Sequence, residues 1–181
     1  TDATWGAATQ VSGEPTPAAA GQIETFTVSG LSAATQYFFA IKSADASGNV
    51  SDLSAVASGT TQAPDTTAPA AVTSLAASQI GRNQVTLTWT ATGDDGSTGT
   101  ASSYNIRYST LAITDDVTFA AATAVMGLPA PKASGSAEMF TVSGLQPGTT
   151  YFFAMKVSDE VPNWSDVSPS LQVTTLPPDV M

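Results

Sequence analysis

Carboxylates are the only abundant side chains in this sequence that could do chemistry. The chain has 15 Asp and Glu residues against 5 Lys and Arg residues, and it contains neither His nor Cys. It therefore lacks an imidazole base, a thiol nucleophile and the usual zinc ligands. Ser and Thr are plentiful, but no base is present to activate them. The adjacent pair Asp94-Asp95 lies in a Gly-rich run that is typical of turns. Taken together, these features lead us to expect a chain that is not an enzyme and needs no organic cofactor.

The acidic composition also limits the partners that the chain can bind. A formal net charge of −10 repels nucleic acid and anionic lipid. The sequence has no run of about 18 apolar residues, so this segment is not expected to insert into a membrane. Lys is scarce, whereas Thr, Ser, Ala and Gly are abundant. This composition favours an extracellular or cell-surface location.

Two Asn-x-Ser sequences offer a second kind of chemistry. They begin at Asn49 and Asn163, and the pattern is that of glycan acceptors in secreted proteins. Asn is equally a favoured turn residue, and most bacteria lack the modification. The sequence leaves both interpretations open.

The two Asn residues are equivalent because the sequence repeats itself with a shift of 114 residues. Phe-Thr-Val-Ser-Gly-Leu at 26–31 recurs at 140–145, and Tyr-Phe-Phe-Ala at 37–40 recurs at 151–154. Roughly half of the positions between 2 and 61 match without a gap. Thr1 aligns with Asp115 in the middle of the second copy, so we expect one complete copy and the later part of another.

The second copy contains a series of short β-strand patterns. Residues 85–90 read Val-Thr-Leu-Thr-Trp-Thr, and this two-residue period indicates a half-buried strand. No segment has the signals of a capped helix, although residues 117–125 are Ala-rich. Short strands separated by turns predict a seven-stranded β-sandwich of about 100 residues. Besides 85–90, strands are expected at 72–77, 104–109, 138–142, 151–157 and 171–175.

Two motifs make the fold prediction more specific. Trp89 in the second strand, and Leu145-Gln-Pro-Gly-Thr-Thr-Tyr151 later on, resemble the signature of the fibronectin type III domain. The resemblance implies immunoglobulin-like β-sandwich modules in tandem. It also implies that the Leu caps the core and that the Tyr hydroxyl bonds back to the backbone at a corner. Leu31 and Tyr37 occupy these places in the first copy, where two Ala residues replace Pro-Gly.

These boundaries divide the chain into four parts. They are an incomplete module at 1–62, a Pro-rich linker at 63–71, a complete module at 72–176 and the start of another linker at 177–181. The incomplete module lacks its first three strands, which would leave a buried face open and strand edges unpaired. Preceding residues, or strands donated by a neighbouring chain, would complete it, and the sequence does not choose between them.

The resemblance gathers acidic residues at one pole of the module. It brings the linker and the loops after the second and sixth strands to the same end. Calcium binds six to eight oxygen atoms from carboxylates, carbonyls and water, so calcium is a candidate ligand there. Solvated turn residues are the alternative interpretation, since the spacing matches no EF-hand loop. The residues concerned are Asp65, Asp94, Asp95, Asp159 and Glu160.

Three aromatic residues are candidates for intermolecular contacts. Strand alternation points Phe152 outward, and Phe38 is its counterpart in the first copy. An outward Phe could bind a neighbouring module, a fibre partner or a sugar ring, or it could lie beneath long side chains of its own sheet. We expect Trp164 to cover the loop end of the core rather than to bind a ligand.

These features together predict a structural spacer or assembly module of a large extracellular protein. Tandem sandwiches joined by Pro-containing linkers form semi-rigid rods, as in an adhesin, an envelope layer or an extracellular filament. Its partners would be neighbouring repeats or copies of itself. The alternative, implied by the resemblance, is an accessory module of a secreted hydrolase. A third reading is a module that binds carbohydrate or another surface protein.

Overall fold

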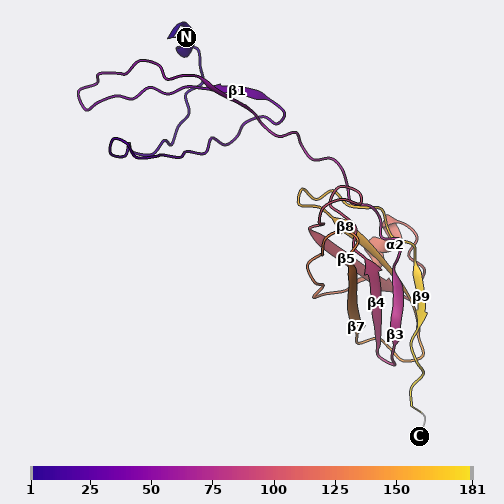
Figure 1. Ribbon diagram of the computed structural model, residues 1–181. Coiled ribbons are helices and arrows are strands. Elements are labelled where there is room, and N and C mark those ends of the chain that lie inside the picture. Colours follow the sequence, from indigo (N-terminus) through magenta and orange to yellow (C-terminus); the bar gives the residue numbers. More distant parts are fainter. Residues whose placement is uncertain (1, 180–181) are drawn as a thin grey trace. The chain divides into compact units, whose positions relative to one another are not determined.

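The computed structural model describes residues 2–179. The chain divides into two compact units, Thr1–Pro64 and Asp65–Met181. Among the described residues the second unit has seven strands, arranged in two layers (Figure 1). One sheet has the order β3-β4-β7 and the other the order β6-β5-β8-β9. This immunoglobulin-like sandwich confirms the predicted fold class. The strands are β3 (Ala76–Ile80), β4 (Gln84–Thr90), β5 (Ser103–Ser109), β6 (Thr123–Ala124), β7 (Ala137–Ser143), β8 (Thr150–Ser158) and β9 (Leu171–Thr174).

The core lies between the two sheets because each strand turns alternate apolar residues inward. β4 pairs antiparallel with β7, and Leu87 lies opposite Phe140. β5 pairs antiparallel with β8, and Ile106 lies opposite Met155. Burying one large apolar side chain stabilises a fold by about 1.5–3 kcal/mol, so the stability of this unit depends on both sheets being present. The buried residues are Val85, Leu87, Trp89, Tyr104, Ile106, Val142, Tyr151, Phe153, Met155 and Val157.

The first strand of the sandwich begins later than predicted. Residues 72–75 form no strand, although Val72 is 1% exposed. The hydroxyl of Ser74 accepts a hydrogen bond from the amide of Thr90 at 2.9 Å, so a side chain takes the place of a ladder carbonyl. The prediction of a strand at 72–77 is therefore wrong except at its last two residues.

A tyrosine corner lies at the start of β8. The hydroxyl of Tyr151 accepts a hydrogen bond from the amide of Gln146 at 3.0 Å. In the first unit the hydroxyl of Tyr37 accepts one from the amide of Ser32 at 2.9 Å. Both contacts confirm what the fibronectin type III resemblance implies. The first corner forms without Gly because Ala34 adopts a φ of 49°, a conformation that costs a non-Gly residue roughly 1–2 kcal/mol.

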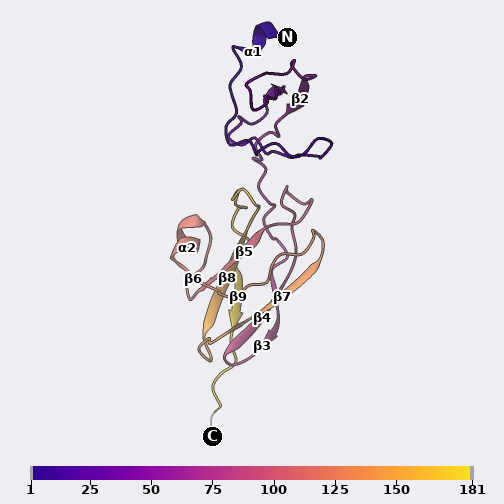
Figure 2. The ribbon, with the colours of Figure 1, turned by 90° about the vertical axis from the view of Figure 1, so that its left-hand side faces the viewer.

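A short helix, α2 (Asp116–Ala121), lies on the outer side of the four-stranded sheet (Figure 2). The expectation that residues 117–125 contain no capped helix is therefore wrong. Asp115 is the N-cap, and its carboxylate accepts a hydrogen bond from the amide of Thr118 at 2.8 Å. The hydroxyl of Thr118 accepts the amide of Asp115 in return, at 3.1 Å, which completes a capping box. No helix among the described residues is long and apolar enough to cross a membrane.

α2 creates a second small core outside the sandwich. Phe119 of the helix and Ile113 before it pack against Ala154, and all three side chains are buried. Ala154 belongs to β8 but faces away from the main core, because it alternates with Phe153. The four-stranded sheet therefore has apolar packing on both faces.

Two basic residues hold α2 in place. Arg107 donates a hydrogen bond to the carbonyl of Ala120 at 2.8 Å and lies 5.3 Å from the ring centre of Phe119. Lys156 forms a 2.6 Å ion pair with Asp116 in the first turn. An acid at the first turn and a cation at the last carbonyls both match the helix dipole.

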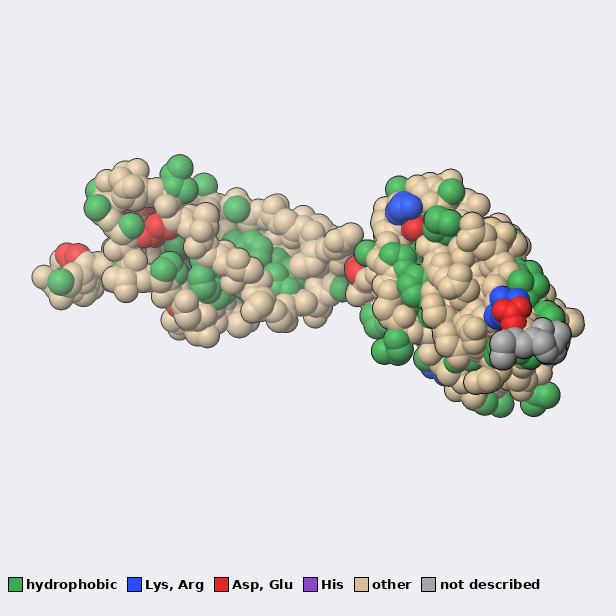
Figure 3. All heavy atoms as spheres, turned by 90° about the horizontal axis from the view of Figure 1, so that it is seen from below, with side chains coloured by type: hydrophobic (Ala, Val, Ile, Leu, Met, Phe, Trp, Pro, Cys, Tyr) green, Lys and Arg blue, Asp and Glu red, His purple; other side chains and the backbone are tan. Residues whose placement is uncertain are grey.

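The first unit contains much less regular structure. Among its described residues, β1 (Gln36–Phe39) and β2 (Ala57–Thr60) form an antiparallel pair, and α1 (Asp2–Trp5) is the repeat's counterpart of α2. Of residues 4–64, whose exposure the structure describes, none is buried. Apolar side chains consequently lie open on its surface (Figure 3). The most exposed include Ile23, Phe38 and Ile41.

Replacing Tyr151 by Phe tests the corner in the second unit. The ring stays in the core, but the amide of Gln146 loses its acceptor, so we expect the free energy of unfolding to fall by about 1–2 kcal/mol. Denaturation by urea, followed by Trp fluorescence, measures the loss. Tyr108→Phe is the control, because the Tyr108 hydroxyl makes no hydrogen bond among the described residues. Equal losses in the two variants would contradict the role of the corner.

Candidate functional site

The predicted acidic residues do lie together, at the end of the second unit that receives its N-terminal segment. The amide of Gly96 donates to the carbonyl of Ala68 at 3.1 Å, and the amide of Ala70 donates to the carbonyl of Gly96 at 2.9 Å. Asn163, in the loop after β8, donates to the carbonyl of Asp65 at 3.4 Å. These bonds tie the N-terminal segment to both loops. We call the resulting cluster the acidic pole: Asp65, Asp94, Asp95, Asp159 and Glu160.

Repulsion is the main electrostatic property of the acidic pole. The charge of Asp65 raises the pKa of Asp95 above its ordinary value of 3.8. Desolvation adds to this rise, and so do the charges of Asp94, Glu160 and Asp159. A raised pKa means that ionised Asp95 is disfavoured, so the carboxylates repel one another at neutral pH.

Protein N–H groups already occupy several of these carboxylates. Asp159 is 2% exposed and accepts hydrogen bonds from the amides of Val161 and Asn163, at 3.0 and 2.8 Å. Asp65 accepts a hydrogen bond from the amide of Thr67 at 2.9 Å. Asp94 accepts one from the amide of Asp95 at 3.0 Å. Among the described residues, no group of three or more acidic side chains is arranged to hold a metal ion. Turn formation accounts for these contacts, and calcium binding at the acidic pole stays a prediction.

Two glycines give the loop after β4 its shape. A Cβ atom on Gly93 would lie 1.5 Å from the carbonyl oxygen of Thr98, and one on Gly99 would lie 1.8 Å from a carboxylate oxygen of Asp94. Gly99 also has a φ of 77°, which favours glycine. The acidic residues of this loop are therefore held in a tight turn rather than on a flexible arm.

The Asn-x-Ser sequences are part of a structural loop. The side-chain nitrogen of Asn163, which would carry a glycan, donates to Asp159 at 2.7 Å. Ser165 is 2% exposed, and its hydroxyl accepts a β8 amide at 3.0 Å. In the first unit Asn49 donates to Asp45 at 2.7 Å, and this contact lowers the pKa of Asp45. These bonds explain the pattern in both copies without a glycan, and glycosylation at Asn49 and Asn163 stays a prediction.

The aromatic candidates differ in exposure. Phe152 lies on the outer face of β8, between Ser109 of β5 and Gln172 of β9, and is half-buried. Its counterpart Phe38 is 67% exposed. Trp164 is 42% exposed and lies in the loop after β8. An intermolecular contact through these residues stays a prediction.

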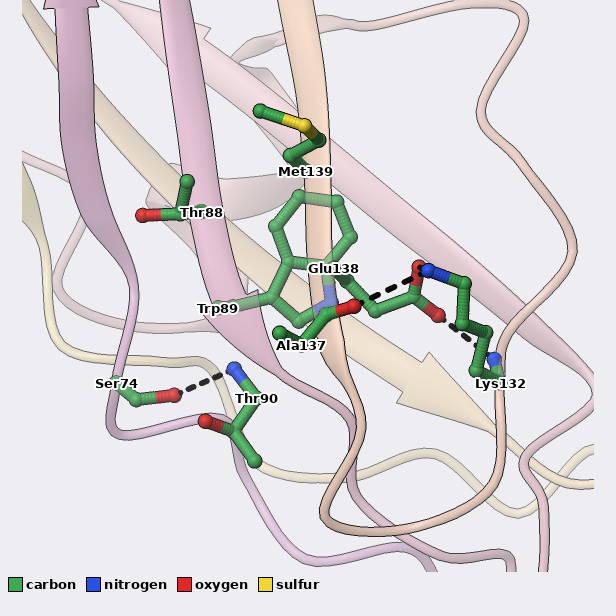
Figure 4. Close-up of a pocket in the computed structure, with 8 residues that line it drawn as sticks. All are labelled: Ser74, Thr88, Trp89, Thr90, Lys132, Ala137, Glu138 and Met139. Atoms are coloured by element: carbon green, nitrogen blue, oxygen red, sulfur yellow. Dashed lines mark hydrogen bonds and ion pairs between the residues drawn. The ribbon is translucent and has the colours of Figure 1, made fainter.

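Sequence reasoning missed a buried acid at the edge of the core. Glu138 of β7 is 5% exposed and lies opposite Trp89 (Figure 4). Its carboxylate accepts the backbone amide of Lys132 at 2.7 Å and lies 3.4 Å from the Lys132 ammonium. Trp89 packs edge-on against Tyr104 with ring centres 5.2 Å apart, and burial raises the pKa of Tyr104. Trp89, Lys132 and Glu138 line a small open pocket beside β4 and β7.

The repeat indicates which of these contacts matters to the fold. Glu24 is the counterpart of Glu138, and it accepts the backbone amide of Ala18, the counterpart of Lys132. The first copy keeps the carboxylate and its hydrogen bond from a backbone amide, but it has Ala18 in place of the Lys. Glu138 therefore holds the loop before β7 and is no candidate for a catalytic acid. A charged residue at an inward position of an alternating strand, present in both copies, is the signal that could have revealed it.

The fold, the tyrosine corners and the occupied carboxylates define a β-sandwich module whose polar groups serve mainly its own loops. Residues 70–174 match the family described as the fibronectin type III domain. The chain belongs to this family, as the motifs around Trp89 and Tyr151 predict. The matched module is itself non-catalytic.

The chain also resembles parts of larger named proteins. It is 39% identical over 155 residues to Chitinase A1 of Niallia circulans, and this match covers 83% of this chain and 19% of the chitinase. It is 34% identical over 157 residues to Endoglucanase B of Cellulomonas fimi, and this match covers 86% of this chain and 14% of the endoglucanase. The chain thus spans less than a fifth of the length of these relatives. Among solved structures, it resembles the FN1-FN3 domains of chicken CNTN1 with a TM-score of 0.44 and 18% identity, over 81% of this chain and 45% of that one.

Replacing Asp95 by Asn tests repulsion at the acidic pole. The folded protein binds the Asp95 proton more readily than the unfolded chain does, so repulsion lowers stability as pH rises through the raised pKa. We expect Asp95→Asn to raise the unfolding temperature at neutral pH. The gain should vanish well below pH 3.8, where both states are protonated, and in molar salt, which screens the charges. Calorimetry at both pH values measures it.

The control for this variant is Asp166→Asn, which removes a charge that does not contribute to the raised pKa of Asp95. It should change stability less. A gain from Asp95→Asn that is the same at neutral and acidic pH would contradict an electrostatic origin.

Replacing Asn163 by Ala tests the structural reading of the Asn-x-Ser sequence. The buried carboxylate of Asp159 loses a side-chain donor at 2.7 Å, so the free energy of unfolding should fall by about 1–3 kcal/mol. Urea denaturation measures the change. Gln79→Ala, at an exposed strand position, is the control and should be close to neutral. If Asn163→Ala is as mild as the control, the loop does not depend on this bond.

Proposed function

We propose that this chain is a non-catalytic accessory segment of a secreted enzyme that degrades an insoluble polysaccharide. The observation that carries the proposal is the pattern of coverage. Relatives named chitinase and endoglucanase match 83–86% of this chain, whereas the match covers only 14–19% of those proteins. Such a segment is an addition to an enzyme rather than its catalytic part. An extracellular location belongs to the same proposal.

The composition of the chain supports a role outside catalysis. It has no His and no Cys, and its buried acid Glu138 is held by a loop amide. Three carboxylates of the acidic pole, those of Asp65, Asp94 and Asp159, accept hydrogen bonds from backbone amides of their own turns. The chain therefore offers neither an imidazole base nor a thiol nucleophile. Catalysis in the full protein would therefore come from another domain.

A spacer role suits the way in which the linker meets the second unit. Pro69 is buried, and the residues on either side of it are hydrogen-bonded to Gly96. The linker is thus fixed to the module from Asp65 onward, which shortens the segment that can rotate freely. A short hinge keeps a module at a defined distance from the next part of a protein. This spacer role is shared with the structural interpretation made from the sequence, and the attached catalytic domain is what distinguishes the two.

A fusion experiment tests the proposal. The chain is placed between an endoglucanase catalytic domain and a cellulose-binding module, and compared with a Gly/Ser linker of equal residue number. We expect equal rates on soluble cellulose derivatives and a higher rate on insoluble cellulose with the present chain. The chain alone should hydrolyse neither cellulose nor chitin. Hydrolysis by the chain alone, or equal rates of the two fusions on insoluble cellulose, would overturn the proposal.

A further inference from the structure

We propose that a hollow beside the end of β4 binds a short stretch of an uncharged polysaccharide chain. The hollow lies within the second unit and has a volume of about 490 Å³. This site rests on the proposed function and deepens it, because it would bring the accessory segment itself into contact with the polymer. We call it the hydroxyl hollow, and six of the residues that line it carry a hydroxyl group: Thr73, Ser74, Thr90, Thr92, Ser97 and Ser134.

Three segments form the walls of the hydroxyl hollow, and hydrogen bonds hold them together. The hydroxyl of Ser74 joins the segment before β3 to the end of β4. The amide of Gly135, in the loop before β7, donates to the carbonyl of Ala91 at 2.9 Å. The hydroxyl of Ser134 donates to the carbonyl of Ser97 at 2.6 Å. A ligand would therefore meet a site that is already formed, which lowers the conformational entropy lost on binding.

The hydroxyl hollow is uncharged, although the chain is strongly acidic. Its other lining residues are Ala and Gly, so none of the ten is ionisable, in a chain with a formal net charge of −10. A metal ion would need carboxylates there, and a phosphate group or an acidic peptide would need Lys or Arg. Hydroxyl groups both donate and accept hydrogen bonds, as the hydroxyls of a sugar do. The lining therefore matches a neutral ligand that is rich in hydroxyl groups.

One hydroxyl in the hollow lacks a partner inside the fold. The Oγ1 atom of Thr92 is buried, and no group among the described residues forms a hydrogen bond with it. Thr86 is also buried, but its hydroxyl is paired with that of Thr141 at 2.9 Å. A buried hydroxyl without a partner costs about 1–3 kcal/mol, so a ligand that supplies the missing bond gains affinity from it. The Thr92 hydroxyl is the observation that points to a ligand in this hollow.

The open pocket beside β4 and β7 continues the hydroxyl hollow. Ser74 and Thr90 line both, and they lie next to each other in Figure 4. The pocket adds Met139 of β7, which is 62% exposed and offers an apolar surface to one face of a sugar ring. Its two charged residues, Lys132 and Glu138, are paired with each other at 3.4 Å. Two adjoining hollows without net charge suit a chain of linked sugars better than a single small molecule.

Titration of the full chain, followed by NMR, tests the proposal. Cellohexaose and chitohexaose are added in separate experiments, because both consist of neutral sugars that carry hydroxyl groups. We expect the amide signals of residues 70–74, 90–92 and 134–139 to shift and to saturate with at least one of them, which identifies the polymer. The signals of the corner at 146–151 should stay in place. Glycerol at an equal concentration of hydroxyl groups is the control.

A threonine substitution separates binding from folding. Thr92→Val removes the unpaired hydroxyl and nearly keeps the shape, so the unfolding temperature should not fall. The dissociation constant of the oligosaccharide should rise by about fivefold, the worth of one hydrogen bond. Thr174→Val, in β9 of the other sheet, is the matched control and should leave binding unchanged.

A second variant keeps the test valid if Thr92→Val does not fold. Thr90→Arg, at an exposed position shared by both hollows, places a long side chain in the site and should abolish binding. Thr174→Arg is its control. Unchanged binding in either Thr92→Val or Thr90→Arg would overturn the proposal.

Three further outcomes would also overturn it. They are no shift with either oligosaccharide, equal shifts with glycerol, and shifts of the same signals that grow with chain concentration in the absence of sugar. The last would identify a second copy of the chain as the occupant. The fusion experiment stays a separate test: a chain that binds neither oligosaccharide but still raises the rate on insoluble cellulose keeps the accessory function and loses this site.

Discussion

Covering β7 and β8 with β4 and β5 is the interaction on which the rest of this structure depends. Phe153 is completely buried where the covering strands are present, and its counterpart Phe39 is only half-buried in the other copy. The repeat thus compares two related sequences, of which one has its second sheet and the other does not. Strand propensity alone does not make residues 26–29 a strand, although their sequence forms part of β7 elsewhere. Non-local pairing and burial decide the outcome, as is general for β-sheets.

The corner and the loop that do form in the first unit are held by contacts between residues close in the sequence. The corner joins residues five positions apart, Ser32 and Tyr37, and the loop bond joins residues four positions apart, Asp45 and Asn49. Serine hydroxyls act in the same way. The hydroxyl of Ser51 accepts a hydrogen bond from the amide of Ser43, and that of Ser165 accepts one from the amide of Val157 in β8, each at 3.0 Å. The loops of this module are therefore built independently of its core, which allows loop residues to vary while the sandwich stays the same.

The sequence predicted the features that rest on pattern and repetition. Alternation revealed the strands around Trp89 and Tyr151. The fibronectin type III resemblance predicted the corner at Tyr151, and the 114-residue register located its counterpart at Tyr37. It missed α2 because the helix has only six residues and includes Val117 and Thr118, whose β-branched side chains weaken helix propensity. It missed the buried role of Glu138 because a charged residue is normally assigned to a solvent face. The acidic pole was predicted as a location, whereas the hydrogen bonds that occupy Asp159 depend on loop conformation and could not be read from residue types.

The basic residues explain how so acidic a chain behaves at its surface. The chain has five, and each has a structural contact: Lys42 with the ring of Trp5, Arg82 with Asp179, Arg107 with α2, Lys132 with Glu138 and Lys156 with Asp116. Because 15 acidic residues face only 5 basic ones, the surface keeps a strong negative field. Such a field opposes edge-to-edge association of exposed strands and favours solubility. It suits a segment that separates other domains in solution better than one that binds an acidic partner.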